Sequence, residues 1–218
     1  MNKAFLFDMD GVIVNTEQIW DIYGRDFAES VFGKDILEKI GDPTGSTLAM
    51  LYEKAVEHGL TKGRDDVFQA YDGYIQTIYD KTTVTPGLKE LIMRLKEMGY
   101  IVGIVSSSRR LWIEMVLKKI PYSTMFDVIF SLDERNLPSK PSPVGYIEAM
   151  KELQTTPKTT IVLEDSNSGI TSAKESGAFT IAFSAFLKEG YQQVKADAIA
   201  NSLADVEKIV RERESILS

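Results

Sequence analysis

Short apolar runs separated by helical patterns constrain the fold of this chain more than any other feature. Each run has strand length and is rich in β-branched or aromatic residues; the runs are Ala4–Phe7, Ile101–Val105, Val128–Phe130, Thr160–Leu163 and Thr180–Phe183. Apolar residues at helical spacing occupy other segments, namely Gly87–Met98, Leu111–Ile120, Val144–Leu153, Asn167–Ser176 and a final amphipathic stretch at Ala204–Arg213. Because strands that alternate with helices form right-handed βαβ units, the sequence predicts an α/β fold whose parallel sheet is covered by helices on both faces.

The stretch from residue 15 to residue 84 interrupts this alternation. Its apolar residues recur at helical spacing throughout, in the segments Glu17–Phe32, Ser46–His58 and Asp65–Tyr79. A helical insertion between the first strand and the next βαβ unit indicates a cap domain at residues 15–84 and a Rossmann-like core at residues 1–14 and 85–218. The chain would cross between the two near Val14 and near Val84, and these crossings would form a hinge.

Length, charge and cysteine content restrict the class of protein. With 218 residues, the chain can bury a substantial core in one domain or two. Its net charge of −7 argues against a general nucleic-acid or membrane-surface binder, although a metal and local charges can still favour an anionic substrate in a pocket. The absence of cysteine excludes disulfides, thiolate catalysis and cysteine-ligated metals. Acids interrupt the early apolar run, and no run approaches the ~20 apolar residues that span a bilayer. We therefore expect a cytoplasmic protein without a nucleic-acid or membrane partner.

Two carboxylates, Asp8 and Asp10, follow the first apolar run immediately. A buried carboxylate that lacks a metal, a proton or a cationic partner is strongly destabilising, so we expect both at the open end of the strand. There they would be available to a hard cation or for covalent chemistry. Gly11 comes next, as a tight turn close to a ligand requires.

Further polar residues follow the later strands. The serines Ser106–Ser108 come after the second apolar run, Glu164 and Asp165 come after the fourth, and Lys140 lies in a loop before a helix. Ligands of open α/β sheets collect at the carboxyl ends of the strands, so these side chains should converge on one face. Each feature alone has a simpler interpretation: the serines and acids could belong to helix N-termini, and the lysine could be solvated. Their joint presence favours an enzyme.

The four segments FDMDGVIV, IVSSS, SKPSP and LEDSNSG resemble, in this order and spacing, the motifs of the haloacid dehalogenase-like superfamily. The resemblance extends over nearly the whole chain, and the helical insertion after the first motif resembles the subfamily with an α-helical cap. That subfamily includes sugar-phosphate phosphatases, phosphoglycolate phosphatases and β-phosphoglucomutases. The resemblance therefore implies the Rossmann-like core with an inserted helical cap.

The resemblance also implies roles for the acidic residues. Asp8 would be the nucleophile that forms an aspartyl-phosphate, and Asp10 would protonate the leaving alkoxide and then activate water. Dehalogenases of the superfamily lack this second aspartate, so its presence favours phosphoryl transfer. Glu164 and Asp165, together with the Asp8 carboxylate and the Asp10 carbonyl, would hold Mg²⁺; Glu164 could act through water.

The remaining motif residues would stabilise the transferring phosphoryl group. Ser106 and the backbone amide of Ser107 would donate hydrogen bonds to its oxygens, and Lys140 would neutralise charge and keep Asp8 ionised. His58, the only histidine of the chain, has no expected role.

The cap would select the substrate. Glu17 should point towards the active site, and Thr44 lies in a turn-rich loop between cap helices that could equally be a plain connection. Trp20, Tyr71 and Tyr74 have helical spacing that is more typical of core residues. Trp20 also stands where β-phosphoglucomutases carry a hinge histidine, and the Asn-Thr-Glu segment before it is closer to hexose-phosphate phosphatases, so hydrolysis is favoured over isomerisation.

These patterns together predict a Mg²⁺-dependent phosphomonoester hydrolase that acts on a small sugar phosphate through an aspartyl-phosphate. The alternatives are a β-phosphoglucomutase-like phosphohexomutase, a pyrophosphatase with a very small substrate, and, least favoured, a non-catalytic phosphate-binding protein. A small phosphorylated metabolite is the expected partner, and we expect a monomer or weak dimer.

Overall fold

The computed structural model describes residues 2–41 and 48–217. The chain divides into two compact units, one formed by Met1–Glu17 with Thr83–Ser218 and the other by Gln18–Thr82. The sequence analysis places the crossings slightly differently, after residue 14 and before residue 85. Residues 15–17, 83 and 84 belong to the sheet unit. Two hydrogen bonds connect the two chain segments there: Asn15 N donates to Thr83 O at 3.2 Å, and Thr83 N donates to Asn15 Oδ1 at 2.7 Å.

The larger unit is built on one parallel sheet with the strand order β3-β2-β1-β4-β5-β6. Its strands are β1 (Lys3–Phe7), β2 (Tyr100–Ser106), β3 (Val128–Ser131), β4 (Thr160–Glu164), β5 (Phe179–Phe183) and β6 (Ala198–Ala200). The predicted α/β fold with a parallel sheet is confirmed. Strand β6 was not predicted, because three residues at the edge of a sheet carry too little periodic signal.

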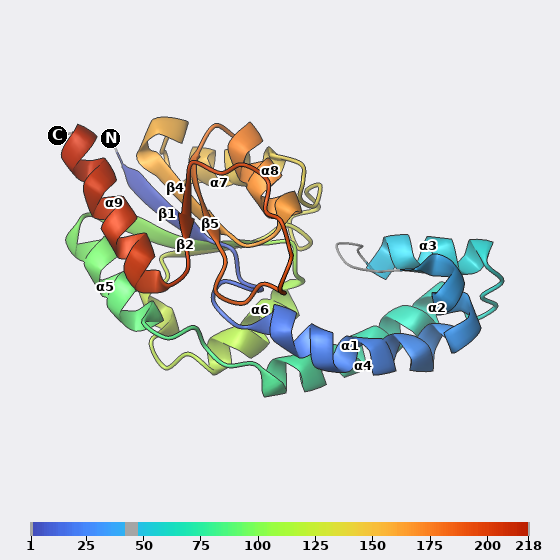
Figure 1. Cartoon of the computed structure of the whole chain (residues 1–218). Coiled ribbons are helices and arrows are strands. Elements are labelled where there is room, and N and C mark those ends of the chain that lie inside the picture. Colours follow the sequence, from blue (N-terminus) through green and yellow to red (C-terminus); the bar gives the residue numbers. More distant parts are fainter. Residues whose placement is uncertain (1, 42–47, 218) are drawn as a thin grey trace. The chain divides into compact units, whose positions relative to one another are not determined.

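Helices cover both faces of this sheet (Figure 1). They are α5 (Leu88–Glu97), α6 (Arg110–Lys118), α7 (Val144–Glu152), α8 (Asn167–Glu175) and α9 (Leu203–Leu217), with short 3-10 helices at Ser123–Met125 and Pro157–Thr159. Helices α5 and α9 pack together on one side of the sheet, and α7 and α8 pack together on the other (Figure 1). The apolar residues of α5, including Leu91, Ile92 and Leu95, are buried, as the spacing of the sequence predicts.

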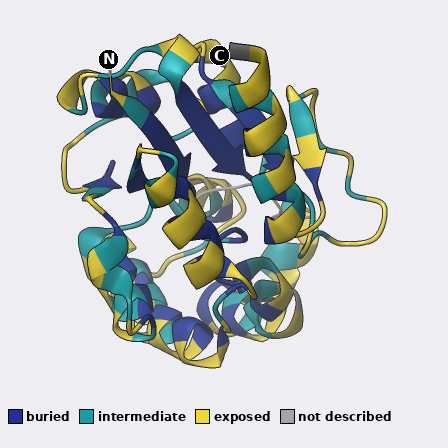
Figure 2. Ribbon diagram, turned by 90° about the vertical axis from the view of Figure 1, so that its left-hand side faces the viewer, coloured by how far each residue is buried: buried dark blue, intermediate teal, exposed yellow. Residues whose placement is uncertain are grey.

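The central strands are the most buried part of the molecule. Figure 2 shows them in dark blue, whereas the helices carry exposed residues along their outer sides. Ala4 and Leu6 of β1 belong to a buried cluster with Val105, Phe130 and Val162 from the neighbouring strands. This explains why these strands read as unbroken apolar runs in the sequence.

The smaller unit consists of helices with a core of their own. The helices are α1 (Thr16–Phe32), which begins in the sheet unit, α2 (Lys34–Ile40), α3 (Leu48–Glu57) and α4 (Arg64–Lys81). Phe27, Val31, Phe32, Ala55 and Val67 are buried together. Helix α2 was not predicted, because its seven residues lie between Gly33 and Gly41 and none of them is buried. Among the residues that the structure describes, none of the helices is long and apolar enough to cross a membrane.

Candidate active site

The register of the sheet brings Asp8 next to the end of β4. Phe7, the last residue of β1, pairs with Leu163 of β4 and with Ile104 of β2. The Asp8 amide extends this ladder by donating to Leu163 O at 3.0 Å. Asp8 therefore lies level with Glu164, at the carboxyl end of the central strands and beside the point where the strand order reverses, which is where ligands of such sheets bind.

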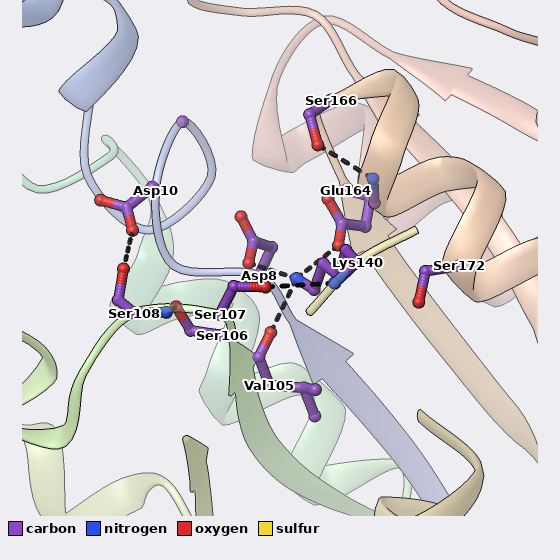
Figure 3. A network of polar contacts seen from close by, with 12 residues as sticks. Asp8, Asp10, Val105, Ser106, Ser107, Ser108, Lys140, Glu164, Ser166 and Ser172 are labelled. Carbon is purple, nitrogen blue, oxygen red and sulfur yellow. Dashed lines mark hydrogen bonds and ion pairs between the residues drawn. The ribbon is translucent and has the colours of Figure 1, made fainter. Parts of the chain in front are cut away.

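Lys140 joins these two carboxylates. Its Nζ lies 2.5 Å from Asp8 Oδ1 and 2.6 Å from Glu164 Oε1, and it donates to Val105 O at 2.9 Å (Figure 3). The lysine side chain is only 7% exposed. Burial by itself would lower the pKa of this amine, but the Asp8 and Glu164 carboxylates outweigh burial and raise it well above its usual range. Lys140 is therefore held as a buried cation.

Glu164 is completely buried at the end of β4. Its Oε1 accepts hydrogen bonds from Lys140 and from the Tyr146 hydroxyl, the latter at 2.6 Å. Burial raises the pKa of its carboxyl to about 7, although Lys140 opposes the shift. Its Oε2 has no hydrogen-bond partner among the described residues, which is unusual for a buried carboxylate.

Three carboxylates offer a place for a cation. One oxygen each of Asp8, Glu164 and Asp165 lies within 4.8 Å of the others. Burial raises the pKa of Asp165 well above its usual range, and the neighbouring carboxylates of Asp8, Glu17 and Glu164 raise it further. Lys140 alone does not balance this much negative charge. The donor set and the unpartnered Glu164 Oε2 fit a hard divalent cation, which prefers oxygen ligands.

Asp10 lies in a tight turn beyond β1. Gly11 adopts a positive φ of 72°, and its amide donates to Val14 O at 2.9 Å. A Cβ at Gly11 would lie 1.8 Å from Asp165 Oδ2, so only glycine fits there. The Asp10 Oδ2 accepts a hydrogen bond of 2.8 Å from the Ser108 hydroxyl (Figure 3).

The serines after β2 occupy different environments. Ser106 is buried, and its Oγ accepts from the Ser108 amide at 3.0 Å. Ser107 is exposed, and its Oγ accepts from the Lys140 amide at 3.4 Å. The sequence analysis named Ser108 without a role of its own, although its position in the same serine run placed it near the site.

One of the residues expected to recognise the substrate, Glu17, lies at this site. Glu17 lies beside Asp165, since a Cβ at Gly11 would come within 3.2 Å of Glu17 Cγ. Burial raises the pKa of the Glu17 carboxyl. The charge of Lys188 lowers this pKa, and the nearby Asp8 carboxylate raises it. The sequence analysis missed Lys188, which belongs to the loop after β5 and has no motif signal. Thr44 lies outside the described residues.

The aromatic residues of the smaller unit pack against one another. The Trp20 ring stacks on Tyr71 at a centroid distance of 5.7 Å, and Phe27 stacks on Tyr74 at 4.4 Å. The Tyr74 hydroxyl donates to Tyr23 O at 2.7 Å. These contacts favour the interpretation of these aromatic residues as core. His58 directly follows the end of α3.

The fold and the acidic centre define a class of enzyme with an open parallel sheet and a carboxylate-rich site at its carboxyl edge. Residues 5–183 match the family described as haloacid dehalogenase-like hydrolase. The chain therefore belongs to the haloacid dehalogenase-like hydrolase family. The resemblance noted in the sequence is confirmed, and with it the prediction of an enzyme.

Curated relatives of this chain include phosphatases. Hexitol phosphatase B of Escherichia coli (strain K12) is 30% identical over 178 residues, which cover 78% of each protein. Pyrophosphatase PpaX of Bacillus mycoides (strain KBAB4) is 26% identical over 214 residues, covering 94% of each. The bifunctional riboflavin kinase/FMN phosphatase of Arabidopsis thaliana is 29% identical over 214 residues, which cover 94% of this chain and 55% of that protein, so the chain spans about half of this relative.

Solved structures support the same fold. The β-phosphoglucomutase of Clostridium difficile has a TM-score of 0.76 and 22% identity, with 100% of each chain covered. At this level of identity, the likeness establishes the architecture and leaves the reaction to the site itself.

Proposed function

We propose that this chain is a Mg²⁺-dependent phosphomonoester hydrolase that acts on a small sugar phosphate through an aspartyl-phosphate. The observation that carries the proposal is the position of Asp8, which is paired with the buried Lys140 and next to the carboxylates of Glu164 and Asp165. The phosphatases among its relatives support the reaction class. That the protein is cytoplasmic, and that it is a monomer or a weak dimer, remain predictions from the sequence.

Asp8 is the nucleophile in this proposal. Lys140 donates to Oδ1 of the Asp8 carboxylate, and in this proposal the Asp8 carboxylate attacks phosphorus. The new bond from Asp8 to phosphorus forms as the bond from phosphorus to the leaving oxygen breaks. Burial of Asp8, which is only 7% exposed, limits competing water during this step.

Asp10 supplies and removes protons. It gives a proton to the leaving alkoxide in the first step and takes one from the attacking water in the second, which releases phosphate and restores Asp8. Its side chain is half-buried, so it can reach a leaving group that arrives from solvent.

Donors around the phosphoryl group would stabilise its charge. We assign this role to the Ser106 hydroxyl, the Ser107 amide and Lys140, whose positive charge is maintained by its two carboxylate partners. Asp8, Glu164 and Asp165, with the Asp10 carbonyl, would hold Mg²⁺. When bound, Mg²⁺ would polarise the phosphoryl oxygens and balance the negative charge of the buried carboxylates.

A small sugar phosphate is the proposed substrate, and Glu17 is the proposed contact for its hydroxyls. The 30% identity to a hexitol phosphatase supports a phosphorylated polyol or sugar. The proposed role of Thr44 rests on the sequence alone.

The experiment is phosphate release with Mg²⁺ across a panel of hexose, pentose and hexitol phosphates, pyrophosphate and β-glucose 1-phosphate. We expect release from one or a few sugar or polyol phosphates, with loss of at least ~10³-fold in Asp8→Asn and loss in EDTA. Asp35→Asn, which changes an exposed carboxylate on α2, is the matched control and should behave as wild type. Unchanged turnover in Asp8→Asn would refute the mechanism.

Two alternatives can be tested with the same panel. The pyrophosphatase relative, which is 26% identical along 94% of the chain, favours a test with pyrophosphate. A phosphohexomutase would convert β-glucose 1-phosphate to glucose 6-phosphate with little free phosphate. The packing of Trp20 against Tyr71 speaks against this, because an indole in an aromatic core cannot provide the acid–base control of a hinge histidine.

A further inference from the structure

Ser108 contacts the carboxylate to which the proposed mechanism assigns both proton transfers. Its hydroxyl donates to Asp10 Oδ2 at 2.8 Å, across a sequence separation of 98 residues (Figure 3). Both residues belong to the sheet unit. The distance is normal for a hydroxyl–carboxylate hydrogen bond, which is stronger than one between neutral groups.

Ser108 is itself held in place by buried groups. The hydroxyl of Ser131, which is fully buried, donates to Ser108 O at 2.8 Å. The Ser108 amide donates to the Oγ of the buried Ser106 at 3.0 Å. Its backbone is therefore fixed on both sides, and its hydroxyl is aimed at Asp10 before any substrate arrives.

A hydroxyl that donates to a carboxylate oxygen restricts the rotation of that carboxyl group. The hydrogen bond from Ser108, whose own backbone is fixed, therefore holds the Asp10 side chain in one orientation.

We propose that Ser108 is a positioning residue that fixes the orientation of the Asp10 carboxyl group for proton transfer. In the first step, the O–H bond of the Asp10 carboxyl breaks and its proton goes to the leaving oxygen as the bond from that oxygen to phosphorus breaks. In the second step, the Asp10 carboxylate takes a proton from water as the water oxygen binds phosphorus and the bond from phosphorus to Asp8 breaks. This inference rests on the proposed function, since it assigns Ser108 to the acid–base residue of that reaction.

Ser108→Ala removes the hydroxyl and tests this role. With the best alkyl phosphate of the panel, we expect kcat to fall by ~10- to 100-fold, because misplacing the acid–base residue loses part of its usual ~10²- to 10⁴-fold contribution, while KM changes less than about twofold. Ser215→Ala removes a serine hydroxyl from the exposed side of α9 and is the matched control, which should keep the wild-type kcat.

p-Nitrophenyl phosphate separates positioning from structural damage. Nitrophenolate is a good leaving group and needs little protonation, so Ser108→Ala should release the first equivalent of nitrophenol about as fast as wild type. Its steady-state rate should then be slow, because hydrolysis of the phosphorylated Asp8 still requires Asp10 as the base. Damage to the site as a whole would slow the first turnover too.

A double-mutant cycle with Asp10→Asn completes the test. If Ser108 acts through Asp10, Ser108→Ala should reduce kcat no further in the Asp10→Asn background. If the alanine variant does not fold, Ser108→Cys keeps the shape with a weaker donor and should give a smaller loss of kcat in the same pattern. An unchanged kcat, a slow first turnover or an additive cycle would overturn the role of Ser108 alone. Failure of the wild type to hydrolyse any phosphomonoester would overturn the proposed function and this inference with it.

Discussion

Two glycines leave room for the carboxylates of the acidic centre because they carry no side chain. Gly169, in the first turn of α8, leaves room for the Glu164 carboxyl: a Cβ there would lie 1.9 Å from Glu164 Oε2. Gly11 leaves the same kind of room for Asp165. The glycine of the fourth motif is thus explained by close packing against a buried carboxylate.

Gly169→Ala should therefore destabilise the protein. We expect a loss of about 1–3 kcal/mol in the free energy of unfolding, typical of overpacking, because the buried carboxylate has little room to move. Gly73→Ala is the matched control, since Gly73 is exposed within α4 and a Cβ there meets nothing within 4 Å. That control should be neutral or gain up to ~1 kcal/mol through helix propensity. Urea unfolding followed by circular dichroism measures both, and equal stabilities would contradict the packing argument.

The buried acids make the stability of the metal-free protein depend on pH. Burial raises the folded pKa of Glu164 from 4.5 to about 7, and burial and neighbouring carboxylates raise that of Asp165 as well. Acids whose pKa is higher in the folded state contribute stability below their unfolded pKa and lose it as pH rises through the folded value. Lys140, whose pKa is also raised, stays charged across this range and adds no slope.

Bound Mg²⁺ should counteract this loss, because it favours the ionised carboxylates. We expect the gain in Tm from Mg²⁺ over EDTA to be larger at pH 8 than at pH 5.5. Thermal unfolding at both pH values, with and without the metal, gives the comparison. A gain that is the same at both pH values would show that these carboxylates do not hold the cation.

At the scale of elements, the loop between β5 and β6 is tied to the start of α8. Asn167 Oδ1 accepts from Val194 N at 2.6 Å, and Asn167 Nδ2 donates to Gln192 O at 3.0 Å. Gln193 Nε2 donates both to Asp165 O at 2.7 Å and to Phe183 O at 2.9 Å. The loop therefore supports the backbone that carries a proposed metal ligand.

Gln193→Ala should weaken this support. Two buried carbonyls would lose a donor, so we expect a loss of ~1–2 kcal/mol in stability and a several-fold weaker Mg²⁺ affinity. Gln192→Ala, which changes the exposed neighbouring glutamine, should stay within ~0.5 kcal/mol of wild type. Urea unfolding and calorimetric Mg²⁺ titration distinguish the two, and identical behaviour would exclude a supporting role for the Gln193 side chain.

Elements with a clear period were predictable from sequence, and the others were not. The five predicted strands and the helices α5 to α8 occur within a few residues of their expected bounds. Helix α2 and strand β6 were missed because one has seven residues, none of them fully buried, and the other has three residues. Their conformations depend on neighbours that local periodicity does not report.

At the scale of the whole molecule, the sheet unit has a continuous core although its chain is interrupted by the helical unit. Val14 and Val84 form an antiparallel bridge, and Asn15 and Thr83 are joined by two hydrogen bonds. The two ends of the insertion therefore leave the sheet unit side by side, so removing the insertion leaves only a short gap to close.

Replacing residues 18–82 with a short Gly/Ser linker should give a chain that folds. Its core cluster is formed by residues outside the insertion. We expect a cooperative thermal transition and an α/β circular dichroism spectrum, with the full-length chain as reference. Leu6→Asp in the same shortened chain, which places a charge in the sheet core, should abolish the transition. A non-cooperative transition in the shortened chain itself would mean that the sheet unit depends on the helical unit.

The sequence alone determined the class of this protein, because its signals are local. The period of apolar residues reports strands and helices, and four short motifs at the ends of strands report a haloacid dehalogenase-like hydrolase. The tertiary structure decided what depends on contacts across the chain: the register that sets Asp8 beside Glu164, the Lys140 contact with Asp8 across 132 residues, and the contact of Ser108 with Asp10. Such contacts arise only when strands and loops distant in sequence are packed together, and no local pattern specifies which atoms then meet.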